Sequence, residues 1–295
     1  MQYGFSIKRK CYLLSVLLMT VWLTGCVQEE FESTPSPAGN GIRFTLTVPD
    51  VNLPSVSSRT MTGTGTAKKE DEIETVDIIV FDMSKTPAVF LEWVSATGVT
   101  QDLADNSTVS FSAVLSPTTA STCIVVVANK ELDNIVSGFT KGATTKVEAM
   151  EKMLHTQTGK WLADGSTTGG YTRIPMYGEK VISKITPSMD PITGINMKRM
   201  LARIDIRNNS ATSNFTVEEV YLANYNTTGY IATAWNTNGQ VTDPVPDTPV
   251  LPAGSGKKTE EGDAILYSVN GNTPYDGEIY TFESLAAEDE IGRAS

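Results

Sequence analysis

A short segment near the start of the chain, and the apolar run that follows it at a distance, most constrain what this sequence can fold into. The first segment alternates apolar and polar residues, with the apolar positions at Ile42, Phe44, Leu46 and Val48. Because side chains of a strand point alternately to opposite faces, this pattern predicts a strand with one buried face. The second segment, Val76–Phe81, is apolar at most positions and predicts a largely buried strand. The sequence therefore predicts a sheet protein whose first strand is separated from its core strands by a long loop.

The loop between these strands is poor in apolar residues and rich in Ser, Thr and Gly. It carries one arginine, Arg59, which precedes Thr60 and stands among small polar residues. We interpret the Arg59–Thr60 bond as an exposed site of proteolytic processing that would separate the first strand from the rest. Arg43 is the other candidate, but it lies inside the predicted strand, where the backbone is paired. The alternative for Arg59 is an ordinary solvated side chain in a chain that is not processed.

The N-terminal residues 1–25 have the composition of a secretory signal. Lys8, Arg9 and Lys10 precede an apolar segment over residues 11–23, which is too short for a membrane-spanning helix. The segment ends in Leu-Thr-Gly-Cys, which resembles a bacterial lipobox with Cys26 as the lipidated residue. That resemblance implies cleavage before Cys26 and insertion of acyl chains into a bilayer. The alternative is a plain signal peptide followed by an incidental cysteine.

The residues that follow Cys26 predict a tether. Residues 27–30, Val-Gln-Glu-Glu, resemble the acidic signal that sends lipoproteins of Bacteroidetes to the cell surface. The rest of the 26–40 segment is rich in Pro, Ser and Thr, which is typical of an extended linker. We therefore divide the start of the chain into a signal at 1–25 and a tether at 26–40.

The charge of the chain excludes one class of partner. The formal net charge is −11, and removal of residues 1–25, which hold three basic and no acidic residues, makes it −14. A protein this acidic repels phosphate backbones, so we expect no nucleic acid as a partner.

The chain offers few groups for catalysis or for metal binding. Cys11 leaves with the signal and Cys26 is lipidated, so Cys123 is the one thiol left, and no disulfide can form within the mature chain. Cys123 lies in an apolar run and is expected to be a small buried residue. The single histidine, His155, has no partner for a nucleophile or for a Cys/His metal cluster. We expect no enzyme activity, no cofactor and no metal.

Two further groups of residues have a functional and a structural interpretation. An acidic run could hold a cation, although a solvated cluster of loop charges is the favoured interpretation; its members are Glu70, Asp71, Glu72 and Glu74. Three tryptophans could stack on sugars if exposed, although packing in the core is favoured; they are Trp93, Trp161 and Trp235.

The remaining pattern is mostly β. Strands are expected at residues 76–81, 88–94, 108–115, 123–128, 181–185, 195–206, 217–223, 230–234, 264–269 and 278–282. One helix is expected from Lys146 to His155, because its apolar residues recur at helical spacing; they are Val147, Met150, Met153 and Leu154. His155 is expected to end this helix as a surface residue. Pro187 and Pro191 mark a boundary between a domain at 41–187 and a domain at 188–295.

Several of these segments resemble the fimbrillin family, the pilin subunits of type V pili in Bacteroidales. The resemblance is carried by the lipobox at Cys26, by Glu74–Phe81, by Thr122–Asn129 and by Lys198–Ile206, with Ile174–Met176 as a further match. It implies two β-sandwich domains of transthyretin-like architecture. It also implies export as an outer-membrane lipoprotein exposed at the cell surface, and cleavage by a protease after an arginine in the loop behind the first strand.

In this family the loss of the first strand opens an apolar groove that a strand of another subunit fills. The resemblance therefore implies other fimbrial subunits as partners, a place in a fimbrium after processing, and adhesion to a host or bacterial surface ligand. The family continues past residues 278–282 with further strands, whereas residues 291–295 have no strand pattern. We expect the second domain to be incomplete.

Two alternatives to this function remain. One is a monomeric surface lipoprotein that binds glycans or a host protein through its loops. The other is an anchor subunit of a fimbrium that keeps its first strand. The sequence leaves open whether a fimbrial subunit of this kind is a shaft, anchor or tip subunit.

Overall fold

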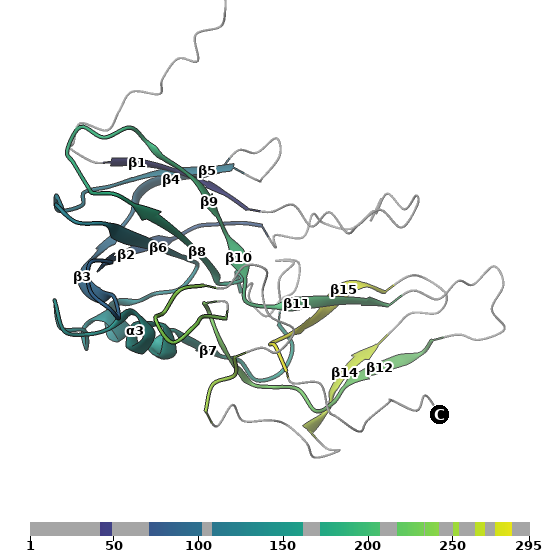
Figure 1. The fold of residues 1–295 in the computed structure, drawn as a ribbon. Helices are drawn as coiled ribbons and strands as arrows, with labels where there is room; N and C mark the ends of the chain where they lie inside the picture. The colour runs from purple at the N-terminus through teal and green to yellow at the C-terminus, as the bar shows by residue number, and fades with distance from the viewer. Residues whose placement is uncertain are drawn as a thin grey trace, which may run out of the picture. The chain divides into compact units, whose positions relative to one another are not determined.

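The computed structural model describes residues 42–48, 71–101, 108–161, 172–206, 217–232, 234–241, 250–253, 263–268 and 275–284. The described residues all belong to one compact unit, which starts at Asn40. Strands dominate it, as predicted (Figure 1). Its elements are β1 Ile42–Thr47, β2 Val76–Asp82, β3 Val89–Ser95, β4 Thr97–Gln101, β5 Thr108–Ala113, β6 Thr122–Ala128, α2 Asp133–Val136, α3 Lys146–Lys152, β7 Leu154–Thr156, β8 Met176–Ile182, β9 Ile192–Asn196, β10 Lys198–Arg199, β11 Ala202–Ile206, β12 Glu219–Leu222, β13 Thr228–Tyr230, β14 Ile265–Ser268 and β15 Tyr275–Thr281.

Two sheets form a β-sandwich. The first, which we call the β1 sheet, has the strand order β4-β5-β1-β9, and the second, the β6 sheet, has the order β10-β8-β6-β2-β3. One apolar cluster joins the inward faces of both sheets, with Phe44 and Phe111 from the β1 sheet and Ile78, Ile124 and Val126 from the β6 sheet. This cluster is the core of the sandwich.

A second apolar cluster covers the other face of the β6 sheet. Alternate residues of the sheet, such as Val125, contact α3, Trp161 and residues of later segments there. Because β2 and β6 are buried on both faces, almost every residue in them is apolar. Cys123 belongs to this cluster and is 0% exposed, so its predicted burial is confirmed.

The tryptophans pack in or against the second cluster. Trp161 is buried in the second cluster, and Trp93 and Trp235 are partly buried against it. The core interpretation is therefore confirmed for Trp161, whereas Trp93 and Trp235 pack against the core with part of each side chain exposed.

The helix α3 begins as predicted but ends earlier. The hydroxyl of Thr145 accepts a hydrogen bond from the amide of Glu148, and the Glu148 carboxylate accepts one from the Thr145 amide, which makes a capping box. The chain leaves the helical conformation at Met153, and Leu154–Thr156 forms β7, which pairs with β13. The prediction that His155 ends the helix at the surface is therefore wrong. It pairs with Gly229 in a sheet instead, because the strand partner outweighs the helical spacing of the apolar residues.

Several strand predictions were also wrong in extent. The expected strand at 181–185 is β8, which begins five residues earlier at Met176. The expected long strand at 195–206 is divided among β9, β10 and β11, because each pairs with a different strand: β1, β8 and β15 respectively. The strand expected at 230–234 is β13, Thr228–Tyr230. The sequence pattern did not predict β4, β7 or α2.

The later strands form ladders of two among the described residues. β11 pairs with β15, β12 pairs with β14, and a small apolar cluster lies beside them, formed by Tyr225, Ile265, Tyr267 and Ile279. β9 and β10 follow the predicted boundary at residue 187, yet they pair with β1 and β8. The division into domains at 41–187 and 188–295 stays a prediction.

Candidate functional site

The candidate site is the position that β1 occupies in its sheet. β1 pairs antiparallel with β5 over six residue pairs, from Ile42 opposite Ala113 to Thr47 opposite Thr108. On its other side it pairs in parallel with β9, where Phe44 lies opposite Ile192. We call the residues of β5, β9 and the β6 sheet that contact β1 the β1 site.

The apolar residues of β1 point into the core, as the alternation predicts. Ile42, Phe44 and Leu46 of β1, and Val48 directly after it, are at most 5% exposed. The rings of Phe44 and Phe111 are stacked, with their centroids 5.0 Å apart and their planes 6° from parallel. Burial of one such side chain contributes about 1.5–3 kcal/mol, so four of them hold β1 in place by roughly 6–12 kcal/mol before entropy is subtracted.

The polar residues of β1 face outward. Arg43 and Thr47 are exposed, and Thr45 is partly exposed. The ladder with β5 and β9 continues to the end of the strand, where the amide of Met197 donates to the Thr47 carbonyl at 2.9 Å. β1 is therefore held on both edges by its backbone and on one face by its side chains.

The predicted processing and lipidation residues lie outside the described residues. Arg59 and Thr60 belong to the 49–70 segment, and Cys26 belongs to the N-terminal segment. Cleavage at Arg59 and lipidation at Cys26 therefore stay predictions.

The chain downstream of that segment is fixed by side chains from distant positions. The Gln101 side chain donates to the Asp71 carbonyl at 2.7 Å and accepts from the Ile73 amide at 3.1 Å. Asn129, in the left-handed region at φ 58°, donates to the Glu72 carbonyl at 2.7 Å and accepts from the Glu74 amide at 3.0 Å. The segment Asp71–Glu74 is thereby held in place directly before β2.

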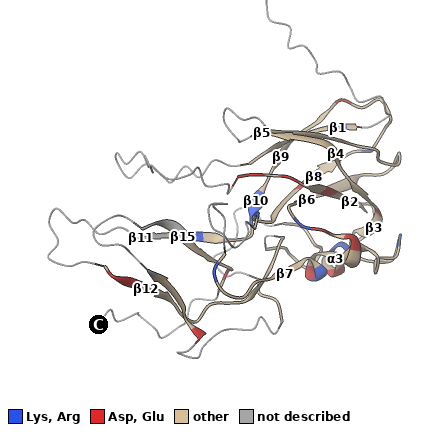
Figure 2. Cartoon of the chain, turned by 180° about the vertical axis from the view of Figure 1, so that it is seen from behind, with Lys and Arg blue, Asp and Glu red and all other residues tan. Residues whose placement is uncertain are grey.

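Ion pairs hold the same segment. Arg173 contacts the carboxylates of Glu72 at 3.4 Å and Glu74 at 2.6 Å, and Arg199 of β10 is paired with Asp71. β10 is blue in Figure 2 because it consists of Lys198 and Arg199. All three carboxylates keep contact with solvent, Glu74 most of all at 60% exposed, which agrees with the favoured interpretation as solvated loop charges. The sequence did not predict that arginines from later in the chain pair with them. Glu70 lies outside the described residues.

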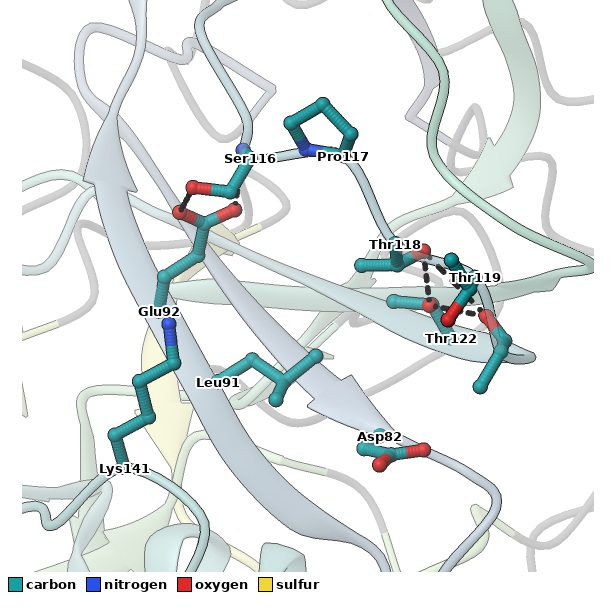
Figure 3. Close-up of a pocket in the computed structure, with 10 residues that line it drawn as sticks. Asp82, Leu91, Glu92, Ser116, Pro117, Thr118, Thr119, Thr122 and Lys141 are labelled. Atoms are coloured by element: carbon teal, nitrogen blue, oxygen red, sulfur yellow. Dashed lines mark hydrogen bonds between the residues drawn. The ribbon is translucent and has the colours of Figure 1, made fainter.

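A cavity of about 250 Å³ lies beside the edge strand β3 (Figure 3). Glu92 lines it and accepts hydrogen bonds from the amide and the hydroxyl of Ser116, at 2.7 and 2.6 Å. Thr118 and Thr122 share a hydrogen bond of 2.9 Å on its other side. Its lining contains no aromatic side chain on which a sugar ring could stack.

The reactive residue types of the described core are in unreactive states. Burial raises the pKa of the Cys123 thiol to about 12, so it is not a thiolate at neutral pH. Burial, helped by the charge of Lys130, lowers the pKa of His155 to about 4, so its imidazole is neutral. The His155 ring packs 5.0 Å from that of Trp161, which is the environment of a structural histidine.

The sequence pattern predicted β1 but did not predict the residues that hold the segment Asp71–Glu74 before β2. Gln101 ends a strand that has one apolar residue, so no periodicity marked it. Asn129 carried a weak signal, because asparagine adopts a left-handed backbone more readily than most other residues do. The hydrogen-bond partners of both lie 28 to 57 residues away in the sequence, and no local pattern reveals them.

The sequence and the fold were compared with those of known proteins. A family model described as "Major fimbrial subunit protein (FimA)" matches residues 42–244, which is more than two thirds of the chain. A solved structure of a fimbrial assembly protein from Parabacteroides distasonis is 10% identical, with a TM-score of 0.39, and the match covers 85% of this chain and 79% of that one. A solved structure of a candidate cell adhesion protein from the same organism is 16% identical, with a TM-score of 0.45. That match covers 85% of this chain and 73% of the other. The comparison with curated proteins found no match.

Proposed function

We infer the function of this chain from the family to which it belongs, that of the major fimbrial subunit protein (FimA), and from the burial of β1. Members of this family are fimbrial subunits, which places the chain among structural proteins of the cell surface. We propose that it is exported as a lipoprotein through Cys26 and cleaved between Arg59 and Thr60. It then assembles with other fimbrial subunits by strand exchange at the β1 site.

The observation that carries this proposal is the combination of deep burial and a single covalent connection. β1 and the adjacent Val48 supply four buried side chains to the sandwich core, and the chain reaches the next fixed residue, Asp71, through the segment 49–70. A cut in that segment leaves β1 held by non-covalent contacts alone. Its departure then becomes a bimolecular equilibrium, because the linker no longer keeps it at a high local concentration.

An emptied β1 site favours a replacement strand. The backbones of β5 and β9 lose their partner, and the apolar residues beneath β1 lose their cover. A strand from another subunit with apolar residues at four alternate positions satisfies both requirements. The backbone pairs supply affinity, and the packing beneath Phe44 and its neighbours supplies selectivity.

The lipid on Cys26 would hold the precursor in the outer membrane before assembly. Among the residues that the structure describes, no helix is long and apolar enough to cross a bilayer. Adhesion of the finished fimbrium to a host or bacterial surface ligand completes the proposed role.

Treatment of the precursor that starts at Cys26 with an arginine-specific protease tests the proposal. We expect one early cut, with Thr60 as the new N-terminal residue by sequencing, followed by oligomers on size-exclusion chromatography. An Arg59→Gln variant serves as the matched control and stays intact and monomeric. An Arg43→Gln variant is cut as the wild type is, because Arg43 lies within a paired strand.

The other outcomes separate the alternatives. A chain that is cut after Arg59 and remains monomeric at high concentration supports the monomeric surface lipoprotein. A chain whose loop resists the protease, but which binds processed subunits, supports the uncleaved anchor subunit.

A further inference from the structure

The order of the β1 sheet makes β1 the link between its two halves. In the described sheet β1 lies between β5 and β9, so β1 separates the β4–β5 hairpin from β9 and pairs with both. When β1 leaves, the hairpin and β9 become separate walls of the β1 site. A new strand enters readily only if both walls keep their positions, because rebuilding them would add an ordering cost to binding.

Two side-chain contacts fix the hairpin to the opposite sheet. At its tip, Gln101 bonds to the Asp71 carbonyl and the Ile73 amide, both in the segment that leads into β2. At its base, the amide and hydroxyl of Ser116, which follows β5, donate to Glu92 of β3, as Figure 3 shows. Neither contact involves an atom of β1, so both persist when β1 has left.

The two contacts coincide with the two ends of β1. Gln101 lies opposite Val109, next to the pair of Thr47 with Thr108 where β1 ends. Ser116 follows shortly after Ala113, which lies opposite Ile42 where β1 begins. The hairpin is therefore held at both ends of the stretch over which it pairs with β1.

The other wall has its own attachments. The ammonium group of Lys180 on β8 donates to the Thr193 carbonyl in β9. The chain then continues into β10, which pairs with β8. Gly178 lies so close to β9 and the residue after it that an added Cβ would meet Met197 Sδ at 2.7 Å and Ile195 Cγ2 at 2.8 Å. β9 is thus packed against the β6 sheet independently of β1.

We propose that Gln101 and Glu92 are positioning residues that hold the β4–β5 hairpin in place after β1 leaves, so that the β1 site accepts a strand without rearrangement. This inference rests on the proposed strand exchange and adds to it the residues that keep the site open. It explains why a partly exposed strand with little apolar character is anchored by a glutamine that bonds twice to the opposite side of the sandwich.

The test uses the chain that starts at Cys26, labelled with a maleimide dye at that thiol. Cys123 does not react, because it is fully buried. After cleavage at Arg59, the dye reports by fluorescence anisotropy on the Kd and on the re-association rate of the β1 piece with the rest of the chain. The variants are Gln101→Met and Glu92→Leu. Thr100→Val is the matched control, because its hydroxyl bonds to Ser110 within the hairpin.

We expect Gln101→Met to raise the Kd about tenfold and to slow re-association by a similar factor. Glu92→Leu has the same effect. Glu92→Gln has a smaller effect on the Kd and on the re-association rate than Glu92→Leu, and Thr100→Val changes neither quantity. The Tm of the uncut chain falls by no more than about 4 °C in each case, because β1 itself then holds the hairpin.

Wild-type re-association in both Gln101→Met and Glu92→Leu overturns the inference. So does a loss in Tm of the uncut chain that accounts for the whole change in Kd, because the residues would then be merely structural. Wild-type pieces that never re-associate overturn the proposed strand exchange itself, and the inference falls with it.

Discussion

Replacement of Phe44 by alanine tests how much of the hold on β1 comes from its buried side chains. The Phe44 ring is 1% exposed and stacks on Phe111 at 5.0 Å. A Phe→Ala change at a buried site costs roughly 3–5 kcal/mol, and loss of the ring pair places this site near the middle of that range, at about 4 kcal/mol. Because about 1.4 kcal/mol corresponds to a factor of ten, the same loss weakens the binding of a cut β1 roughly a thousandfold.

Two measurements check this value. Denaturant unfolding of the uncut chain gives the change in the free energy of unfolding, and the Kd of the cut pieces gives the change in strand affinity. Thr47→Ala is the control, because Thr47 lies on the same strand but points to solvent, and we expect it to cost less than about 0.5 kcal/mol. A Phe44→Ala effect below about 1 kcal/mol, or one equal to that of Thr47→Ala, would refute the assignment of β1 as an apolar strand held by the core.

Three further predictions follow from the packing of the described residues. Gly178→Ala lowers the free energy of unfolding by about 1–3 kcal/mol, because its Cβ would overlap Met197 and Ile195. Gly138→Ala is the control and changes this free energy little, because its Cβ would lie 3.6 Å from the Ile135 carbonyl; thermal unfolding of the two variants measures the difference. Lys146→Met costs about 3–5 kcal/mol, because it leaves the Glu179 carboxylate without the buried ammonium that contacts it at 2.6 Å. A Lys146→Met, Glu179→Gln double variant removes the unpaired charge and keeps an acceptor for the Tyr177 hydroxyl, so its failure to recover any of this loss would contradict the buried-pair explanation. Stability falls as the pH drops from 6.5 to about 4, because burial lowers the pKa of His155 and the unfolded chain therefore binds the proton first. His155→Gln makes the plot of Tm against pH flatter in that window. An unchanged slope would exclude His155 as the cause of the pH dependence.

The sequence predicted those strands whose own apolar pattern shows which of their faces are buried. β2 and β6 are apolar along nearly their whole length, and the alternation in β1 and β5 marks which face is buried. The pattern failed where the partner strand decides the structure. Residues 195–206 read as one strand because their apolar positions run on, but the chain moves between three ladders there.

The candidate site divides in the same way. The three apolar residues of β1 and the Val48 that follows them were predictable, because their own alternation with polar residues shows which face is buried. The fixing of Asp71–Glu74 was not, because acidic residues in a loop are typical of solvated charge, and only the fold brings Arg173 and Arg199 to them. The same holds for Gln101, whose two partners are backbone groups, and backbone groups carry no sequence signal.

A strand can be both well buried and removable only if its loss leaves the rest of the core intact. The described residues of the cluster on the α3 side of the β6 sheet include none from β1, so that cluster keeps its packing when β1 leaves. The fixed segment before β2 has the same consequence at the level of the chain. Asp71–Glu74 is held by Gln101 and Asn129, so a cut upstream of it frees β1 without loosening β2. The fold would thus confine the effect of the proposed cleavage to one side of the sandwich, because a subunit without β1 would still have the packed cluster on the α3 side of the β6 sheet.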